Sequence, residues 1–304
     1  MFDYTERRGD VRMRIRRLIA AAVSSAMLLC GCSVNSAVKE REQEPLPPTA
    51  EGKLEELTCY CFKAGKADAH LIWNSDLAIL IDCGEKGFGK EIVDYMSKAG
   101  IKKLDMLIVT HFDKDHVGGA AKVLRSVRVD RVIQSNCIKE SEEYSEYAEQ
   151  LKALGKRGEI LSERQSFRFG NAEVTIYPPM RQSYPDEPSN NSSLITSVRY
   201  GSKSLLFAGD AEDLRMNEFI AREGGRSYDF LKVPYHGHFQ SRLGAFLNDV
   251  RPKIAVITSS DEILEDRAVM KMLSDLGAET YLTRTAPVIV KCDGESISAH
   301  YEEK

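Results

Sequence analysis

The sequence predicts an α/β (α+β) protein in which two β-sheets pack face to face and helices cover their outer faces. The chain has 304 residues, is 42% hydrophobic and carries 42 basic against 46 acidic residues, which is typical of a globular protein with a sizeable core. Short runs rich in Val, Ile and Leu alternate with segments of helical periodicity. The first half is β-rich and ends in strand–helix units, and the second half repeats that course. Two packed sheets satisfy this pattern, although periodicity alone does not select one fold.

The N-terminal segment 1–32 has the features of a lipoprotein signal peptide. Four Arg between positions 12 and 17 precede an apolar stretch, residues 18–29, that is too short to span a bilayer. The stretch ends in Leu29-Cys30-Gly31-Cys32, which resembles a bacterial lipobox and implies that Cys32 is lipidated. The alternative is an internal apolar helix. Residues 33–56 are polar and rich in Pro, which indicates a flexible linker. The expected location is extracytoplasmic, with a lipid anchor in the bacterial cell membrane.

The remainder of the chain is expected to contain strands and helices in alternation, with hairpin turns at Gly201-Ser202 and Asp293-Gly294. The expected strands are Leu57–Phe62, Ala69–Trp73, Leu77–Ile81, Met106–Thr110, Arg131–Gln134, Glu173–Tyr177, Ser193–Tyr200, Ser204–Ala208, Phe230–Val233, Ile254–Thr258, Val288–Lys291 and Ser296–His300. The expected helices are Phe88–Ala99, Gly119–Ser126, Glu142–Leu154, Glu212–Arg222, Ser241–Asn248 and Asp266–Leu276.

The distribution of charge restricts the substrates that the whole surface could attract. Residues 1–31 contain six Arg and three acidic residues, which leaves the rest of the chain with a net charge of −7. A body of that sign does not attract polyanions over its whole surface. A phosphate substrate would therefore have to be bound by a local feature, such as a metal ion.

One motif carries side chains that bind metals. After the strand ending at Thr110 come His111, Asp113, Asp115 and His116, followed by a pair of glycines. Open α/β sheets place their ligands at this position, after a strand and before a helix. We expect His111 and Asp113 to face one way and the turn into the helix to reorient the next two ligands. The motif therefore predicts two ligand sets a few ångströms apart, and the glycines permit close backbone approach.

This motif, His-x-Asp-x-Asp-His before Gly-Gly, resembles the signature of the metallo-β-lactamase superfamily. Three further segments resemble its other motifs in order: Ile79–Gly84 with Asp82 beside the metal site, Leu205–Asp210, and Phe230–Gly237. The resemblance covers nearly the whole of residues 57–304, taken as the hydrolase domain. It implies an αββα four-layer sandwich and metal-dependent hydrolysis.

Within the superfamily, the sequence is most similar to the extracytoplasmic hydrolase domain of the ComEC/Rec2 competence proteins. The segments that carry this likeness are Asn190–Leu194, Gly209–Glu212 and Leu231–His238. Choline-phosphate esterases of bacterial surfaces are also similar. The likeness implies hydrolysis of a phosphodiester.

Carried over residue by residue, the resemblance implies two divalent metal ions that share the carboxylate of Asp210. The implied ligands of one ion are His111, Asp113 and Asp210, and those of the other are Asp115, His116, His236 and Asp210. A shared carboxylate offsets the repulsion between two cations, and a metal-activated water then attacks phosphorus in line. The residues expected to be catalytic are Asp115, Tyr235, His236 and His238.

The sequence departs from the family pattern at both ends of the site. Asp113 replaces an imidazole, and Asn190 or Asn191 stands where many relatives have a third-motif His. These oxygen ligands favour Mn²⁺ or Mg²⁺ at the first position, while the second suits Zn²⁺ or Mn²⁺. Tyr235 and His238 replace the first His and the Ser of a His-His-Gly-Ser run. If the first His of that run is the ligand, a metal contact is lost. If it is the second, His236 suffices and the two replacements face substrate, which is the assignment we prefer.

Three functions are compatible with this reading. The first is a metal-dependent phosphodiesterase or nuclease whose substrate is a nucleic acid or a small ester. The second is a hydrolase of the same fold that acts on choline-phosphate esters, lactones or β-lactams. The third is a non-catalytic binding lipoprotein. The sequence offers no evidence for a protein partner, so the expected partners are the phosphodiester and, through the N-terminal lipid, the membrane.

Overall fold

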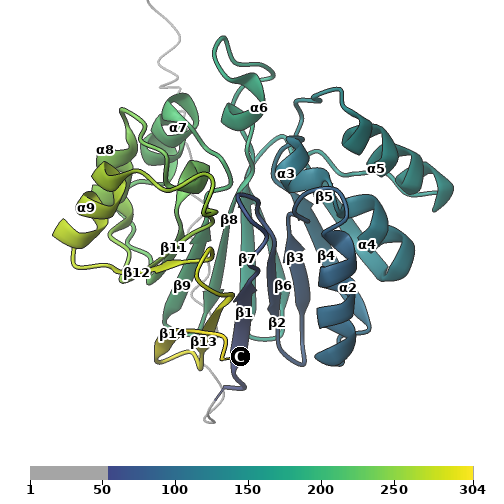
Figure 1. Cartoon of the computed structure of the whole chain (residues 1–304), viewed down its shortest axis with the longest axis horizontal. Coiled ribbons are helices and arrows are strands. Elements are labelled where there is room, and N and C mark those ends of the chain that lie inside the picture. Colours follow the sequence, from purple (N-terminus) through teal and green to yellow (C-terminus); the bar gives the residue numbers. More distant parts are fainter. Residues whose placement is uncertain (1–53, 304) are drawn as a thin grey trace, which may run out of the picture. The chain divides into compact units, whose positions relative to one another are not determined.

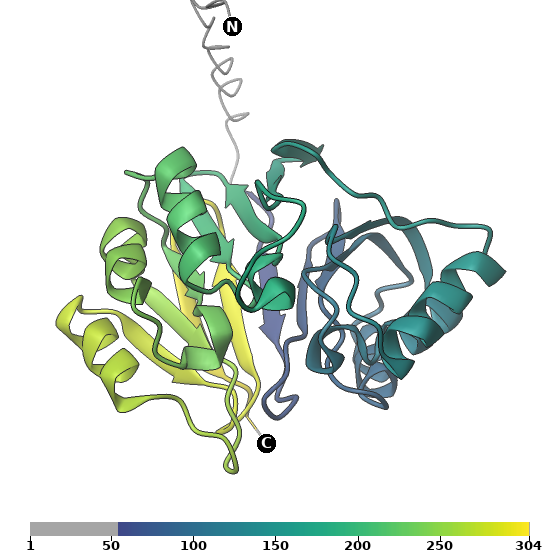
Figure 2. The same ribbon diagram turned by 90° about the horizontal axis from the view of Figure 1, so that it is seen from above.

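The structure, a computed structural model, describes residues 54–303. The expected signal peptide, Cys32 and the expected linker up to residue 53 lie outside the described residues. Two seven-stranded sheets face each other, with helices on both outer sides (Figures 1 and 2). None of the described helices is long and apolar enough to cross a membrane.

The first sheet combines the N-terminal strands of the described part with its C-terminal hairpin. Its strands, in spatial order, are β14 (Ile297–Tyr301), β13 (Val288–Cys292), β1 (Leu57–Cys61), β2 (His70–Trp73), β3 (Ala78–Ile81), β4 (Lys103–Val109) and β5 (Arg128–Gln134). The last three run parallel, and the other neighbours are antiparallel.

The second sheet is built from the second half of the chain. Its strands, in spatial order, are β12 (Glu279–Leu282), β11 (Ile254–Ile257), β10 (Phe230–Lys232), β9 (Lys203–Phe207), β8 (Ile195–Tyr200), β7 (Ala172–Tyr177) and β6 (Gln165–Phe169). The strands from β9 to β12 run parallel, and the other neighbours are antiparallel.

Buried apolar side chains fill three layers between these elements. Successive residues of β2 alternate between two of them: Leu71 packs toward the helices and Ile72 toward the opposite sheet. The helices on the first sheet are α2 (Gly89–Lys98), α3 (Lys114–Val117), α4 (Ala120–Ser126) and α5 (Glu142–Ala153). Those on the second are α7 (Asp213–Glu223), α8 (Leu243–Val250) and α9 (Arg267–Asp275). The four-layer αββα sandwich expected from the sequence is thus confirmed (Figure 2).

Every expected strand and helix is present, with small differences at the ends. The turns at Gly201-Ser202 and after Cys292 are also observed. Two strands were not expected, β6 and β12, and both lie at an edge of the second sheet. An edge strand buries little of its surface, so its sequence lacks the apolar alternation that identifies inner strands. Of the five residues of β6, none is buried.

Candidate metal centre

The functional side chains follow the carboxyl ends of parallel strands in both sheets. The loop after β4 carries the motif residues 111–116, the loop after β9 carries Asp210, and the loop after β10 carries His236. A short helix, α6 (Pro188–Asn191), lies at this end of the sandwich (Figure 1), and a 3₁₀ turn, η1 (Pro234–Gly237), contains His236. The backbone N–H of Leu194 donates to the carbonyl of Thr110 at 3.0 Å, which joins the two sheets beside these loops.

The signature loop folds as its sequence indicates. Asp113 is extended, with φ −70° and ψ 147°, and α3 begins at the next residue. This change of direction turns Asp115 and His116 inward from a new angle. At Gly119, a Cβ would overlap the carbonyl of Cys83 and the backbone of Gly89. The predicted need for glycine at this close approach is confirmed.

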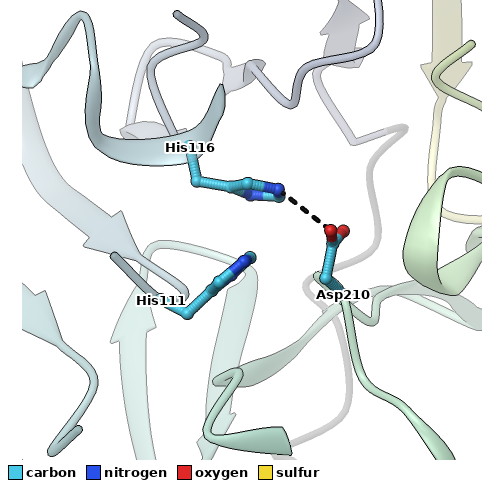
Figure 3. Close-up of side chains that lie close together, drawn as sticks. All are labelled: His111, His116 and Asp210. Atoms are coloured by element: carbon cyan, nitrogen blue, oxygen red, sulfur yellow. Dashed lines mark ion pairs between the residues drawn. The ribbon is translucent and has the colours of Figure 1, made fainter. Parts of the chain in front are cut away.

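Three buried side chains from the two sheets meet at the centre. His111 and His116 point their rings at the carboxylate of Asp210 (Figure 3), and His116 Nε2 lies 3.3 Å from Asp210 Oδ2. The two imidazole rings are 4.0 Å apart between centroids. One ligand atom from each of the three lies within 4.8 Å of the others, which is close enough to hold one metal ion.

A second group shares His116 with the first. Asp115, His116 and His236 also bring ligand atoms within 4.8 Å of one another. His236 Nε2 is 3.0 Å from Asp210 Oδ2 and 3.5 Å from Asp115 Oδ2. Asp210 therefore contacts imidazoles of both groups, as expected for a shared carboxylate. His236, rather than Tyr235, joins the cluster, in line with the preferred reading of the His-His-Gly segment.

The inner atoms of this cluster have the property expected of metal ligands. Four buried atoms have no hydrogen-bond partner among the described residues: Nε2 of His111, His116 and His236, and Oδ1 of Asp210. Buried polar atoms are almost always hydrogen-bonded. Atoms of ligand type that converge on one another without such bonds fit a site for divalent cations. The residues present therefore fit the expected metal centre.

The outer nitrogens of the three imidazoles are all engaged, which fixes the direction of the rings. Nδ1 of His116 lies 2.8 Å from a carboxylate oxygen of Asp82, which can only accept. Nδ1 of His236 lies 2.9 Å from Oγ1 of Thr258, whose proton is donated to Asp68 at 2.7 Å. Nδ1 of His111 faces the hydroxyl of Thr110.

Thr110 Oγ1 donates to Asp82 at 2.7 Å and lies 3.1 Å from Nδ1 of His111. Its single proton is used, so the imidazole is the donor in that contact. All three histidines are thus assigned the tautomer with Nδ1–H outside and the Nε2 lone pair inside, which is the arrangement of metal-binding histidines. Asp82, which the sequence analysis placed beside the site, contacts His116 from a left-handed backbone, φ 57°.

The loop that carries His236 has an unusual backbone. Tyr235, His236 and Gly237 have φ of 49°, 52° and 76°, so three successive residues are left-handed. Such a conformation costs of order 1–3 kcal/mol for each non-glycine residue and persists only where the surroundings impose it. A Cβ at Gly237 would lie 2.9 Å from the Ile257 side chain. The turn sends His236 inward and Tyr235 outward.

Two buried charged residues were missed by the sequence reasoning. Lys232, fully buried in β10, forms an ion pair with Asp68, donates to the carbonyl of Gly209 at 3.0 Å and lies 3.5 Å from Asp210 Oδ1. Asp68 also accepts from Thr258. A Lys within the apolar run Phe-Leu-Lys-Val was a usable signal, because a lysine buried in a strand needs a charged partner. Asp68 lies between two alanines and gave only a weak sequence signal.

Asp113 lies at the border of the cluster. Its Oδ1 is 3.9 Å from His111 Nε2 and accepts from Ser189, and its Oδ2 is 2.7 Å from Lys139 Nζ. The side chain is 22% exposed, compared with 3% for Asp210. Asp113 can therefore reach a cation held by His111, although it is not among the residues gathered within 4.8 Å.

The two asparagines of the third motif contact loops next to the cluster. Asn190 Nδ2 donates to Glu212 at 2.7 Å, and Asn191 links Asp186 to the backbone of Arg215. Their role as ligands stays a prediction. From the same segment, Ser193 Oγ lies 3.4 Å from His111 Nδ1 and accepts from the backbone N–H of Asp210 at 3.2 Å.

Burial and neighbouring charges shift the pKa values of the three histidines in opposite directions. Burial, followed by the nearby His116, lowers the pKa of His111 to about 4. Burial also opposes protonation of His116 and His236, but Asp210 and the other carboxylates outweigh it and raise the pKa of both. Burial would raise the pKa of Asp210, yet the two imidazoles and Lys232 hold it well below its ordinary value. These shifts favour protonation of His116 and His236 when no metal is bound, and a bound cation would take the place of those Nε2 protons.

Comparisons with known proteins agree with this geometry. The model of the metallo-beta-lactamase superfamily matches residues 63–259. The chain is 30% identical over 172 residues to ComE operon protein 3 of Bacillus subtilis, covering 56% of this chain and 22% of that protein. It is 29% identical over 201 residues to Recombination protein 2 of Haemophilus influenzae, covering 64% and 23%. The chain thus spans about a quarter or less of these relatives, and the resemblance to competence proteins is confirmed.

Among solved structures, the fold is similar to that of the metallo-beta-lactamase fold protein YhfI from Bacillus subtilis. The TM-score is 0.50 at 12% identity, with 75% of this chain and 96% of that chain covered. This likeness concerns the fold alone. Because the family model covers well over half of the sequence and includes the converging ligands of both sheets, the chain belongs to the metallo-beta-lactamase superfamily, a hydrolase fold that implies bound divalent metal ions.

Proposed function

We propose that this protein is a metal-dependent phosphodiesterase or nuclease that acts outside the cytoplasm through a metal-activated water. The observation that carries the proposal is the convergence of three imidazole Nε2 atoms on the carboxylate of Asp210. These three nitrogens and Oδ1 of Asp210 are buried and have no hydrogen-bond partner among the described residues. Residues that would hold two cations a few ångströms apart suit an in-line displacement at phosphorus.

The ligands would divide between two positions that share Asp210. His111 and Asp113 would complete the first position, where oxygen ligands favour Mn²⁺ or Mg²⁺. Asp115, His116 and His236 would complete the second, which suits Zn²⁺ or Mn²⁺. When bound, the ions would supply Lewis acidity and activate a water.

The protein's other groups act on the substrate side. Tyr235 and His238 lie beside the second position, with their rings 5.4 Å apart and edge to face. Burial and the charge of Glu212 raise the pKa of Tyr235, so its O–H stays protonated and donates a hydrogen bond to a phosphoryl oxygen. Burial and the neighbouring His236 lower the pKa of His238, so its ring is neutral near pH 7 and offers one N–H donor.

Three further observations support a phosphodiester outside the cell. One of the similar proteins, Recombination protein 2, is named for recombination. The acidic body disfavours long polyanions, so a short or single-stranded substrate fits better than duplex DNA. The N-terminal signal peptide and Cys32 predicted from the sequence would place the domain on the outer side of the membrane.

A substrate panel tests the proposal. The purified protein is stripped of metal, reloaded with Mn²⁺, Zn²⁺ or Mg²⁺, and assayed on bis-p-nitrophenyl phosphate, single-stranded DNA, a choline-phosphate ester, a lactone and a β-lactam. We expect hydrolysis of bis-p-nitrophenyl phosphate and single-stranded DNA with Mn²⁺ or Zn²⁺. Hydrolysis confined to the choline-phosphate ester, which is also a phosphodiester, would restrict the substrate to that class of ester. Hydrolysis confined to the lactone or the β-lactam would refute the phosphodiesterase and favour the alternative hydrolases. Absence of both bound metal and turnover would favour a binding lipoprotein.

A further inference from the structure

A second lysine lies at the opposite, solvent side of the centre from Lys232. Lys66 belongs to the loop between β1 and β2, and its Nζ is 3.1 Å from Asp115 Oδ2. Its side chain is 25% exposed, and that of Asp115 is 11% exposed. Asp115 Oδ2 also faces His236 Nε2 at 3.5 Å. The ammonium therefore stands where the buried ligands meet solvent.

The loop holds Lys66 in place through its backbone. The N–H of Asp68 donates to the carbonyl of Asp115 at 3.1 Å, and the carbonyl of Asp68 accepts from Gly84 at 2.8 Å. The first bond ties the chain two residues after Lys66 to the signature loop, and the second ties it to the loop after β3. The ammonium is thus positioned relative to the metal ligands by the fold, and not only by its own ion pair.

Hydrogen-bond accounting separates the two lysines. An ammonium group has three N–H donors. Lys232 is fully buried, and its contacts are Asp68, the carbonyl of Gly209 and Asp210. Within the part of the chain that the structure describes, Lys66 donates one hydrogen bond, to Asp115. Two of its donors remain for a ligand that enters from solvent.

The groups beside Lys66 are donors as well. Its Nζ lies 5.9 Å from the centre of the Tyr235 ring, and Tyr235 in turn contacts His238. An ammonium, a phenol and an imidazole therefore lie next to one another beside His236. A tetrahedral oxyanion has several acceptor oxygens and matches such a set of donors. The net charge of −7 outside the N-terminal segment makes this local cation the more significant.

We propose that Lys66 is the substrate-positioning residue of the site and binds a non-bridging oxygen of a phosphoryl group, in a subsite completed by Tyr235 and His238. The proposal rests on the proposed function for the identity of the substrate, a phosphate ester. It assigns selection for an anionic substrate to the β1–β2 loop, outside the ligand motifs. Lys66 keeps its bond to Asp115 while its remaining donors reach the ligand.

The test compares Lys66→Gln, Lys66→Arg and a control, Lys63→Gln. Lys63 lies on the same loop, is exposed, and contacts only the carbonyl of Thr285, at 3.5 Å, among the described residues. Each protein is loaded with Mn²⁺, its bound metal is counted, and inorganic phosphate is titrated by calorimetry. We expect Lys66→Gln to weaken phosphate binding about tenfold or more, Lys66→Arg to retain most of it, and Lys63→Gln to leave it unchanged, with equal Mn²⁺ in all four proteins.

Kinetics provide a second measurement that a purely structural role would not reproduce. For bis-p-nitrophenyl phosphate, Lys66→Gln should raise KM and change kcat little, and higher salt should reduce the difference from the parent because ions screen the charge. Phosphate binding by Lys66→Gln equal to that of the parent would overturn the proposal, as would a parent that binds no phosphate. A parent that binds phosphate through Lys66 but hydrolyses no diester would refute the proposed function alone.

Discussion

The two ligand positions of the centre differ in how completely the fold prepares them. At the second position, Asp115, His116 and His236 are buried, and the two imidazoles are directed by Asp82 and Thr258. At the first, His111 is equally buried, but its carboxylate neighbour Asp113 is partly exposed and held by Lys139 and Ser189. The second position is therefore held by hydrogen bonds to buried residues, whereas the first depends on a partly exposed carboxylate.

This difference has a thermodynamic consequence. A cation entering the second position finds ligands that are already ordered, so little conformational entropy remains to be lost. A cation entering the first must draw in Asp113 against an ion pair with Lys139. We therefore expect the second position to bind its ion more tightly, and metal loss to begin at the first.

Asp210→Asn should give the largest effect, because this carboxylate contacts both groups. The amide keeps the size of the side chain but removes its charge, so both positions lose their shared ligand and activity should fall at least 10³-fold, about 4 kcal/mol. The measurement is kcat/KM for a diester together with metal content. Asp261→Asn, at an exposed acid paired with Arg284, is the control. Full activity in Asp210→Asn would refute a shared carboxylate.

Separate removal of one imidazole from each group tests the difference itself. Loss of a ligand should exceed the 10–100-fold effect typical of an outer partner, so His236→Ala should weaken the tighter of two binding steps by more than 100-fold, about 3 kcal/mol. His111→Ala should instead affect the weaker step. Calorimetric titration of Mn²⁺ into the stripped proteins resolves the two steps. Identical effects of both substitutions would contradict the assignment of distinct positions.

The candidate ligands could be named from the sequence, since they occupy short motifs next to predicted strands. The residues that contact these side chains from outside the cluster could not be predicted. Thr258 and Asp68 are 190 positions apart and meet only because the two sheets pack together. Lys232 gave a local signal, a charge within an apolar strand, whereas its partner Asp68 did not. The edge strands β6 and β12 were missed for a related reason, because weak burial leaves no periodic pattern to detect.

In the metal-free protein, the free energy of unfolding should depend on pH differently for the two positions. His111 should affect it below pH 6.5, and His116 and His236 should affect it above pH 6.5. The pKa of His111 is lowered to about 4 in the folded protein, against about 6.5 when unfolded. The unfolded state therefore gains a proton first as pH falls from 6.5 to 4, and the folded state loses roughly 3 kcal/mol of stability. The pKa values of His116 and His236 are raised. Their contribution is complete below 6.5 and is lost as pH rises through the folded-state values.

Thermal unfolding from pH 4.5 to 9 with a chelator measures this dependence. The melting temperature should be highest near pH 6.5, and Mn²⁺ should remove the decline on the alkaline side because a cation replaces the protons. His111→Ala should reduce the decline on the acidic side only. A metal-free protein whose stability rises steadily from pH 6.5 to 9 would show that the second-group histidines are not protonated.

Asp113→His should have the smallest effect, and it tests which metal ion the first position prefers. An imidazole is a softer ligand than a carboxylate, so the substitution should shift preference at the first position from Mn²⁺ toward Zn²⁺ by about tenfold, roughly 1.4 kcal/mol. The partly exposed site leaves room for the larger ring, and Lys139 can turn to solvent. Asp113→Asn, which removes the charge without adding nitrogen, is the control. Competition titrations measure the Zn²⁺ to Mn²⁺ ratio at each step. A ratio that changes at the tighter step instead would place Asp113 at the second position, because only a residue that contacts the cation can alter its selectivity so strongly.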